Sequence, residues 1–198
     1  MPRLILGSGS PRRCSLLTIA GFDIAAVMPP NIDEQQAAGE PPRSYVRRLA
    51  KEKAAAVKVD NAWVLAADTI VHRDGQIFDK PADEADAHRM LGRLSGGWHS
   101  VTSAWELRWR GPEACPSTRE RIHGSRTSRV KFRDLTDVEI ACYIRTGEGY
   151  DKAGGYAVQG EGAALIERVV GSTTNVVGLP LDSVIPALLT LGIARRST

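Results

Sequence analysis

Apolar residues along this chain alternate between strand-like runs and helical periodicity, which is typical of a fold that mixes strands with helices. Residues 3–7 form a short apolar run that predicts a buried strand. Ser10 and Pro11 follow it and favour the N-cap and first turn of a helix that ends at Gly21. A second helix is predicted over residues 42–59. Its apolar stripe consists of Tyr45, Val46, Leu49, Ala50 and Val57.

The middle of the chain predicts a central strand followed by a hairpin. Residues 63–71 are almost continuously apolar, as in a strand that is buried on both faces. Asp74-Gly75 then gives a turn signal before the short run 76–78. Residues 101–109 alternate between apolar and polar side chains and predict a strand with one buried face. The polar, basic stretch 110–128 predicts a loop or the end of a hairpin.

The remaining elements complete a mixed α/β pattern. A capping box, Thr136 with Glu139, predicts the start of a helix that runs through Ile144. The other helices and strands are predicted over residues 82–94, 130–132, 164–170 and 180–191. Because no repeat, linker or low-complexity stretch divides the chain, we expect one domain over residues 1–198.

Composition narrows the class of protein further. The chain is 42% hydrophobic with a net charge of +3, which excludes general disorder, and it contains no apolar run of about 18 residues that could span a membrane. Three widely spaced cysteines, without a CxxC pair, predict a reducing, cytoplasmic setting. Residues 108–133 carry eight basic and two acidic residues, so the positive balance comes from one segment. We therefore expect neither a stable nucleic-acid partner nor a membrane partner.

The segment Ser8-Gly9-Ser10-Pro11-Arg12-Arg13 joins the first strand to the first helix. A helix N-terminus offers free backbone N–H groups to an anion, and two arginines in the first turn oppose the helix dipole unless an anion lies there. This predicts a phosphate site. The alternative is a solvated basic helix start.

Asp68 interrupts the apolar run 63–71, and a buried carboxylate needs a cation, a metal or several hydrogen bonds. A two-residue turn at Asp74-Gly75 would pair Thr69 with Lys80, whereas a three-residue turn would pair Asp68 with Lys80. Either register predicts Lys80 beside this carboxylate. The alternative is a structural ion pair in a sheet.

Three further residues are candidates for the same site. Lys53 lies on the apolar stripe of the second helix, where it either snorkels to solvent or reaches a phosphate in a cleft. Glu34 could supply an oxygen ligand to Mg²⁺, although acidic loop residues are usually only solvated. Gln159, in the glycine-rich stretch 147–162, can read the edge of a base; the alternative there is a flexible surface loop.

These motifs, taken in order, resemble the Maf family of nucleoside triphosphate pyrophosphatases. The matching segments are 8–13, 67–69, 80–81, 94–99, 151–154, 159–160 and 178–180. The resemblance implies an elongated mixed sheet with helices, Maf/ITPase-like, in two lobes around a nucleotide cleft. It also implies hydrolysis of a nucleoside triphosphate to a monophosphate and pyrophosphate, which removes non-standard or excess nucleotides with the help of Mg²⁺ or Mn²⁺.

The family's site residues fall on specific positions of this chain. Asp68 takes the catalytic position. The phosphate-binding and cleft positions fall on Ser8, Ser10, Arg12, Arg13, Glu34, Lys53, Lys80 and Lys152. We expect Asp68 and Glu34 to hold the metal ion. Arg12, Thr69 and Gln159 match the branch that cleaves dTTP and UTP, although Gly149 stands where the family usually has proline.

Two other classes of function stay open at this stage. The resemblance also allows a nucleotide-binding regulator of cell division and septum formation without significant turnover. A nucleic-acid-binding module would need aromatic residues interleaved with a basic face, and Trp105 and Trp109 are the candidates. A homodimer is also allowed.

Overall fold

The computed structural model describes residues 2–111, 114–193 and 195, and this part of the chain forms a mixed sheet flanked by helices. The strand order is β2-β1-β3-β5-β6-β7, and β4 pairs with β3 outside this path. β1 runs parallel to β2 and β3, whereas the long strands β3, β5 and β6 are antiparallel. The strands are β1 (Arg3–Leu6), β2 (Ala26–Val27), β3 (Ala62–Arg73), β4 (Gln76–Phe78), β5 (Trp98–Arg110), β6 (Arg121–Phe132) and β7 (Ile166–Val170). The predicted α/β class is confirmed.

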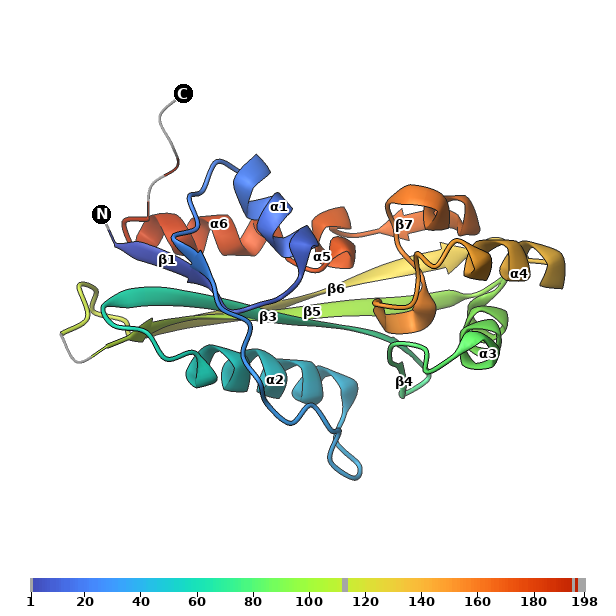
Figure 1. Ribbon diagram of the computed structural model, residues 1–198, viewed down its shortest axis with the longest axis horizontal. Coiled ribbons are helices and arrows are strands. Elements are labelled where there is room, and N and C mark those ends of the chain that lie inside the picture. The colour runs from blue at the N-terminus through green and yellow to red at the C-terminus, as the bar shows by residue number, and fades with distance from the viewer. Residues whose placement is uncertain (1, 112–113, 194, 196–198) are drawn as a thin grey trace.

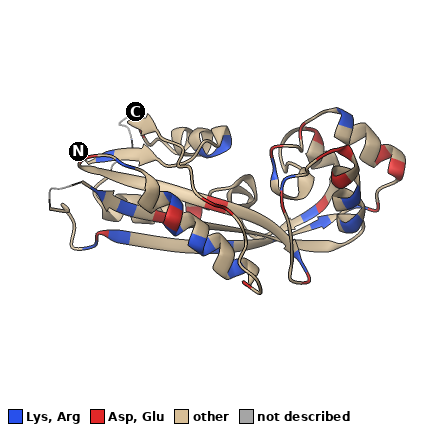
Figure 2. Ribbon diagram, turned by 60° about the horizontal axis from the view of Figure 1, so that its bottom comes forward, with Lys and Arg blue, Asp and Glu red and all other residues tan. Residues whose placement is uncertain are grey.

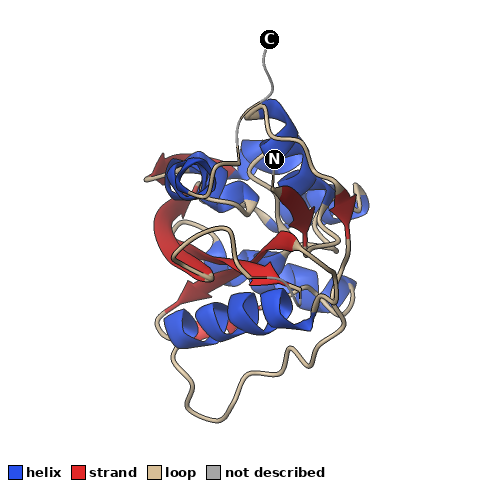
Figure 3. Ribbon diagram, turned by 90° about the vertical axis from the view of Figure 1, so that its left-hand side faces the viewer, coloured by secondary structure: helices blue, strands red, loops and turns tan. Residues whose placement is uncertain are grey.

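Helices cover both faces of this sheet (Figures 1 and 3). Helices α1, α5 and α6 lie on one face, α2 lies on the opposite face, and α3 and α4 gather at the far end of the long strands. The helices are α1 (Pro11–Ile19), α2 (Pro42–Ala56), α3 (Glu84–Leu94), α4 (Asp137–Arg145), α5 (Thr173–Val177) and α6 (Leu181–Thr190). The elongated, two-lobed arrangement implied by the resemblance is therefore present.

Each part of the sheet has its own apolar core. Leu17, Trp63 and Leu188 belong to the cluster beneath α1 and α6. Leu91 and Phe132 belong to a second cluster at the far end, where α3 and α4 pack. Because the cores lie on different parts of the sheet, the long strands β3, β5 and β6 connect the two ends of the molecule.

The prediction for residues 101–128 was wrong in two respects. β5 is buried on both faces, because Thr102, Ala104 and Glu106 are as inaccessible as the residues that alternate with them. The stretch predicted as a loop to residue 128 is strand β6 from Arg121 onward. Gly124 within this strand allows close packing: a Cβ there would lie 2.9 Å from the Trp105 ring. A glycine required by a neighbouring aromatic ring has the same sequence signal as one in a turn.

The basic segment is largely neutralised within the fold. Arg108 lies 2.8 Å from buried Glu106, and Arg126 lies 2.9 Å from Asp182 of α6. Basic and acidic residues are also interspersed along the rest of the ribbon (Figure 2). The arginines of β5 and β6 therefore do not form a uniformly basic surface.

The turn between β3 and β4 decides the register that the sequence left open. Asp74 and Gly75 have φ angles of 51° and 81°, and Arg73 pairs with Gln76 across a two-residue loop. This geometry is typical of a tight hairpin turn. Strand β4 ends at Phe78, however, so Lys80 lies beyond the paired part of the hairpin.

The C-terminal elements differ slightly from their predicted bounds. Strand β7 begins at Ile166 because the preceding residues Gly160–Leu165 form a 3₁₀ helix. The short helix α5, capped by the Ser172 side chain, lies between the elements predicted over residues 164–170 and 180–191. In the described ranges, no helix is both long and apolar enough to cross a membrane.

Candidate active site

The loop between β1 and α1 presents hydrogen-bond donors at a helix N-terminus. Ser8 is buried, and its hydroxyl oxygen accepts hydrogen bonds from the Ser10 backbone N–H at 3.2 Å and from Arg13 Nη1 at 2.9 Å. Because both contacts use lone pairs, the Ser8 hydroxyl hydrogen is left to donate. Ser10 occupies the predicted N-cap position of α1, but its side chain makes no capping hydrogen bond. This helix start therefore keeps the donors that an anion requires.

Arg13 connects this loop to β3 and to the segment after α5. Its Nε donates to the carbonyl of Gly178 at 2.9 Å, and its Nη2 donates to Thr69 Oγ1 at 3.1 Å. Gly178 has a φ of 128°, a backbone conformation that favours glycine. With the bond from Nη1 to Ser8, the Arg13 side chain is fixed on three sides.

Asp68 forms the buried ionic centre of the site. Lys53 Nζ lies 2.5 Å from Asp68 Oδ1 and 2.7 Å from Glu34 Oε2. Lys53 and Asp68 are 9% and 8% exposed, so the predicted burial of this carboxylate and its need for a cation are both borne out. The partner is Lys53 from α2, whereas the sequence had placed Lys80 there. Burial raises the pKa of Asp68 although Lys53 and Arg13 favour its charged form.

Asp79 is an acidic residue of the site that the sequence analysis did not single out. Burial raises its pKa, and the negative charges of Asp68 and Glu34 raise it further. The Asp74-Gly75 turn could have indicated this residue, because a two-residue turn brings the chain after Phe78 back alongside the part of β3 that contains Asp68. Asp79 and Lys80 both line the cavity described below, and each of them keeps part of its surface exposed.

The glycine-rich loop 147–162 approaches α1 from the other end of the sheet. Asp151 Oδ2 accepts from Arg12 Nη1 at 2.9 Å, and Asp151 Oδ1 lies 2.5 Å from Lys152 Nζ. Although burial opposes the shift, hydrogen bonds from Lys152 and Arg12 lower the pKa of Asp151. A Cβ on Gly149 would lie 2.0 Å from the carbonyl oxygen of Gly155, so this loop conformation requires glycine there.

A cavity of about 670 Å³ lies between the two ends of the molecule, within the described residues. Every sequence-predicted site residue lines it: Ser8, Ser10, Arg12, Arg13, Glu34, Lys53, Asp68, Thr69, Lys80, Lys152 and Gln159. Glu148 and Tyr156, which the sequence analysis did not select, line it as well. The fold thus brings together residues that are up to 151 positions apart in the chain. Their individual roles stay predictions.

The carboxylates fit a hard divalent cation. Oxygens of Glu34 and Asp68 converge on one ammonium nitrogen, and the charge of Glu34 raises the pKa of Asp68. Mg²⁺ usually binds one or two carboxylates and completes its shell with water and substrate phosphates. In the part of the chain that the structure describes, no three His, Cys, Asp or Glu side chains form a complete metal site by themselves. Two carboxylates beside a phosphate site match that mode of binding.

Comparison with known proteins places the chain among relatives of almost the same length. A dTTP/UTP pyrophosphatase of Geobacter metallireducens is 44% identical over 96% of each chain. The protein of that name from Anaeromyxobacter dehalogenans is 48% identical over 91% of this chain and 89% of its own. That from Thermus thermophilus is 43% identical over 96% of each. A solved HAM1 protein from Coxiella burnetii overlaps with 67% of this chain and 73% of its own at a TM-score of 0.43 and 15% identity.

The family described as Maf-like protein matches residues 3–191, which includes every segment that lines the cavity. The sequence match and the three relatives agree over nearly the full chain. The chain belongs to the Maf family.

Proposed function

We propose that this protein hydrolyses nucleoside triphosphates, with dTTP and UTP preferred, to a nucleoside monophosphate and pyrophosphate. The observation that carries the proposal is a buried carboxylate, Asp68, in one cavity with a cationic helix N-terminus. The three relatives named above are dTTP/UTP pyrophosphatases, and this supports the choice of substrate.

The start of α1 binds the triphosphate in this proposal. The Ser8 hydroxyl hydrogen and the free N–H groups of the first turn donate to phosphate oxygens, and Arg12 and Arg13 supply fixed positive charge. Lys152 approaches from the opposite loop and Lys80 from the end of β4. Such preorganised cations stabilise the charge that develops on the phosphates as the bond breaks.

Asp68 orients the attacking water and takes its proton. Burial raises the pKa of this carboxylate, which strengthens it as a base, while Lys53 and Arg13 keep it charged. Lys53 also holds Glu34 beside Asp68. Lys53 is fixed between the two carboxylates, so its first role is to keep them together. The predicted contact of its ammonium group with a substrate phosphate is a second role.

Asp68 and Glu34 would hold the divalent cation, Mg²⁺ or Mn²⁺. When bound there, such an ion neutralises phosphate charge and lowers the pKa of water. The raised pKa of Asp79 marks a third carboxylate that a cation would stabilise in its charged form.

Thr69 and Gln159 select the nucleoside. Thr69 lies at the Arg13 side of the cavity, and Gln159 lies on the glycine-rich loop. A carboxamide both donates and accepts, as the edge of thymine or uracil requires. The cytoplasmic setting, the single domain over residues 1–198 and a homodimer all stay predictions.

Pyrophosphate release from a panel of common and methylated nucleoside triphosphates, with Mg²⁺ and with Mn²⁺, tests the proposed function. We expect the largest kcat/KM for dTTP and UTP and little release without a divalent cation. Tight binding of nucleotide without release would contradict the proposal and favour the regulator of cell division. Preference for a methylated purine would contradict the assigned substrate.

A further inference from the structure

Ser103 on β5 is buried next to the proposed nucleoside-selecting residue. It pairs with Thr69 of β3 across the sheet, and its Oγ lies 2.8 Å from Thr69 Oγ1. Ser103 and Asn175 of α5 are both fully inaccessible, with 0% exposure. Helix α5 packs against β5 next to α1 (Figure 1), and Asn175 on this helix contacts Ser103.

The hydrogen bonds of Ser103 have a fixed direction. Its Oγ donates to the backbone carbonyl of Asn175 at 2.8 Å, because a carbonyl can only accept. A serine hydroxyl carries one hydrogen, so Ser103 Oγ has only lone pairs left for Thr69. The Thr69 hydroxyl therefore donates its hydrogen to Ser103 in the 2.8 Å contact.

The other contact of Thr69 agrees with this direction. Arg13 Nη2 donates to Thr69 Oγ1 at 3.1 Å, and a guanidinium cannot accept. The Thr69 hydrogen is thus used toward Ser103, and one of the lone pairs is used toward Arg13. A longer contact of 3.3 Å to the Gly178 carbonyl offers the Thr69 hydroxyl a weaker second acceptor.

Asn175 holds this arrangement rigidly. Its Oδ1 accepts from the Ser103 backbone N–H at 3.1 Å, and its Nδ2 donates to the Val101 carbonyl at 2.9 Å and to Ser128 Oγ at 3.0 Å. A buried amide with all these partners is costly to displace, because each broken bond leaves an unsatisfied polar group.

We propose that Ser103, anchored by Asn175, is a positioning residue that fixes Thr69 as a hydrogen-bond acceptor toward the substrate. The proposal rests on the proposed function, because it concerns the nucleotide bound in the same cavity. Ser8 has the opposite polarity, since its lone pairs are used and its hydrogen is free. The site thus presents a donor at Ser8 and an acceptor at Thr69.

The polarity of Thr69 restricts the group that it contacts on the nucleotide. Only an N–H or O–H can donate to the remaining lone pair, so the partner is the imide N–H of the base or a sugar hydroxyl. A nucleotide that offers only a lone pair at this place would leave two acceptors facing each other, which is unfavourable. Ser103 therefore contributes to selectivity without touching the substrate.

Ser103→Ala, Thr69→Val and the double variant form a cycle that tests this coupling. We expect Ser103→Ala to lower kcat/KM for dTTP about fivefold to tenfold, mainly through KM, which is the effect of one loosened hydrogen bond. In the Thr69→Val background, where no hydroxyl is left to orient, the same change should have an effect of less than about twofold. Equal effects in both backgrounds would overturn the proposal.

Thr102→Val is the matched control. It also removes a buried hydroxyl from β5, but the described contacts of Thr102 Oγ1 are with His72 and Thr127, and not with Thr69 or Asn175. We expect it to lower stability in urea as much as Ser103→Ala does, while kcat/KM stays within about twofold of the unchanged chain. An equal loss of kcat/KM would assign the effect to general loosening of the sheet and contradict the proposal.

Binding of a non-hydrolysable α,β-methylene analogue of dTTP separates this proposal from the proposed function. If the unchanged chain binds the analogue but releases no pyrophosphate from dTTP, the proposed hydrolysis is wrong. The coupling between Ser103 and Thr69 is then measured from the Kd of the analogue for the four proteins of the cycle. Analogues with N3-methylthymine or without the 3′-hydroxyl then identify the donor. One of them should bind more weakly to the unchanged chain and lose this penalty in Thr69→Val. If neither does so, Thr69 accepts no hydrogen bond from the substrate and the proposal is wrong.

Discussion

At the scale of single residues, the site depends on a carboxylate that is expensive to bury. Asp68 is 8% exposed, and its charge is balanced by Lys53 at 2.5 Å and by the nearby Arg13. A buried ion pair contributes little net stability, but removal of one partner leaves an uncompensated charge. A gain in stability therefore does not explain why a charged residue is buried here, whereas a chemical role of Asp68 does.

Asp68→Asn should lower kcat at least about 100-fold, because the amide cannot take a proton and general-base catalysis contributes at least that factor. Binding of the methylene analogue should be retained, since Arg12, Arg13 and Ser8 are unchanged. Asp60→Asn, at an exposed acidic residue, is the control and should leave kcat within about twofold. An active Asp68→Asn protein would contradict the assignment of the base.

The residues of the site differ in how far they could be predicted from the sequence. Asp68 was identifiable because a charge in an otherwise apolar strand needs a partner, and the periodicity of α2 placed Lys53 on the buried stripe. The pairing of these two residues was not identifiable, because it depends on how α2 packs across β3. The Asp74-Gly75 turn indicated that Asp79 returns toward Asp68, but its raised pKa was not identifiable, because it depends on burial and on the charges of Asp68 and Glu34 from other elements.

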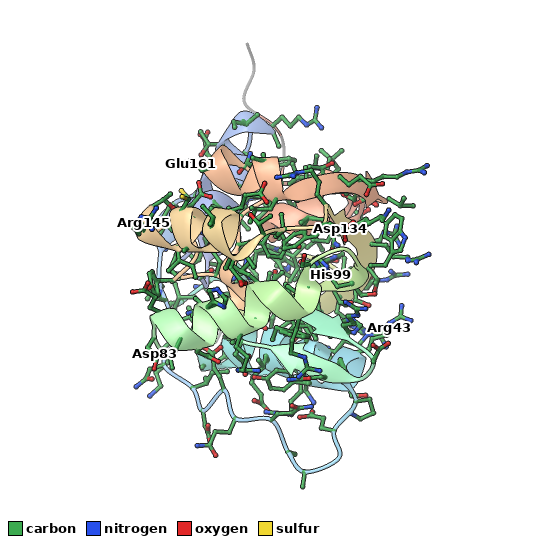
Figure 4. The ribbon with its side chains drawn as sticks, turned by 90° about the vertical axis from the view of Figure 1, so that its right-hand side faces the viewer. Arg43, Asp83, His99, Asp134, Arg145 and Glu161 are labelled. Carbon is green, nitrogen blue, oxygen red and sulfur yellow. The ribbon has the colours of Figure 1, made fainter. Side chains whose placement is uncertain are left out.

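At the scale of elements, β5 is fastened to the glycine-rich loop by a buried contact. His99 Nε2 lies 2.7 Å from the Tyr156 hydroxyl, and Tyr156 lines the cavity. His99 belongs to the end of the molecule that Figure 4 shows, where Asp83 lies at the N-terminal end of α3 and Arg145 at the C-terminal end of α4. Burial lowers the pKa of His99 to about 3.

Stability should therefore fall between pH 6.5 and pH 3. The unfolded chain binds a proton at His99 near pH 6.5, whereas the folded chain does so only near pH 3. The neutral, buried His99 contributes its full stabilisation above the unfolded pKa. Below that pH the free energy of unfolding falls by up to about 1.4 kcal/mol for each pH unit. We measure the free energy of unfolding in urea at several pH values from 7 to 4. It should depend less steeply on pH in His99→Gln than in the unchanged chain. His123→Gln, at an exposed histidine, should keep the original slope; a shallower slope in this control would contradict the role of burial.

The capping box of α4 gives a stability prediction that is separate from the site. Thr136 Oγ1 accepts from the Glu139 N–H at 3.3 Å, and the Glu139 carboxylate accepts from the Thr136 N–H at 2.8 Å. Thr136→Ala should lower the free energy of unfolding by about 1 kcal/mol, and Thr136→Ser should restore most of it. Turnover should be unchanged in both variants; a loss of turnover would show that α4 acts on the cleft.

Elements with local signals were predictable, and those that depend on distant contacts were not. The capping box of α4 and the Asp74-Gly75 turn act within a few residues, so their positions were correct. Strand β6 was missed at its start because serines, arginines and Gly124 suggest a loop unless the neighbouring ring of Trp105 is known. The same dependence on neighbours explains why both faces of β5 are buried.

At the scale of the whole molecule, the cavity lies between the two ends of the molecule, where the glycine-rich loop approaches α1. The Arg12–Asp151 ion pair joins α1 to the glycine-rich loop across 139 positions of the chain. A nucleotide that contacts both sides should therefore stabilise the fold as a unit, by mass action.

The methylene analogue of dTTP with Mg²⁺, at about 100 times its Kd, should stabilise the protein by about 2.7 kcal/mol. For a chain of this length that corresponds to a rise in Tm of roughly 5–10 °C. Thymidine lacks the phosphates that we propose the α1 N-terminus binds, so at the same concentration it should raise Tm much less. Equal shifts for both ligands would place the main binding energy in the base and contradict the proposed phosphate site.

The identity of the products tests the central claim most directly. Phosphorus NMR of dTTP incubated with the protein and Mg²⁺ distinguishes pyrophosphate from orthophosphate in one experiment. The arrangement of Asp68 beside the proposed phosphate-binding helix start predicts equal amounts of dTMP and pyrophosphate. Formation of dTDP with orthophosphate, or unchanged dTTP after prolonged incubation, would contradict it.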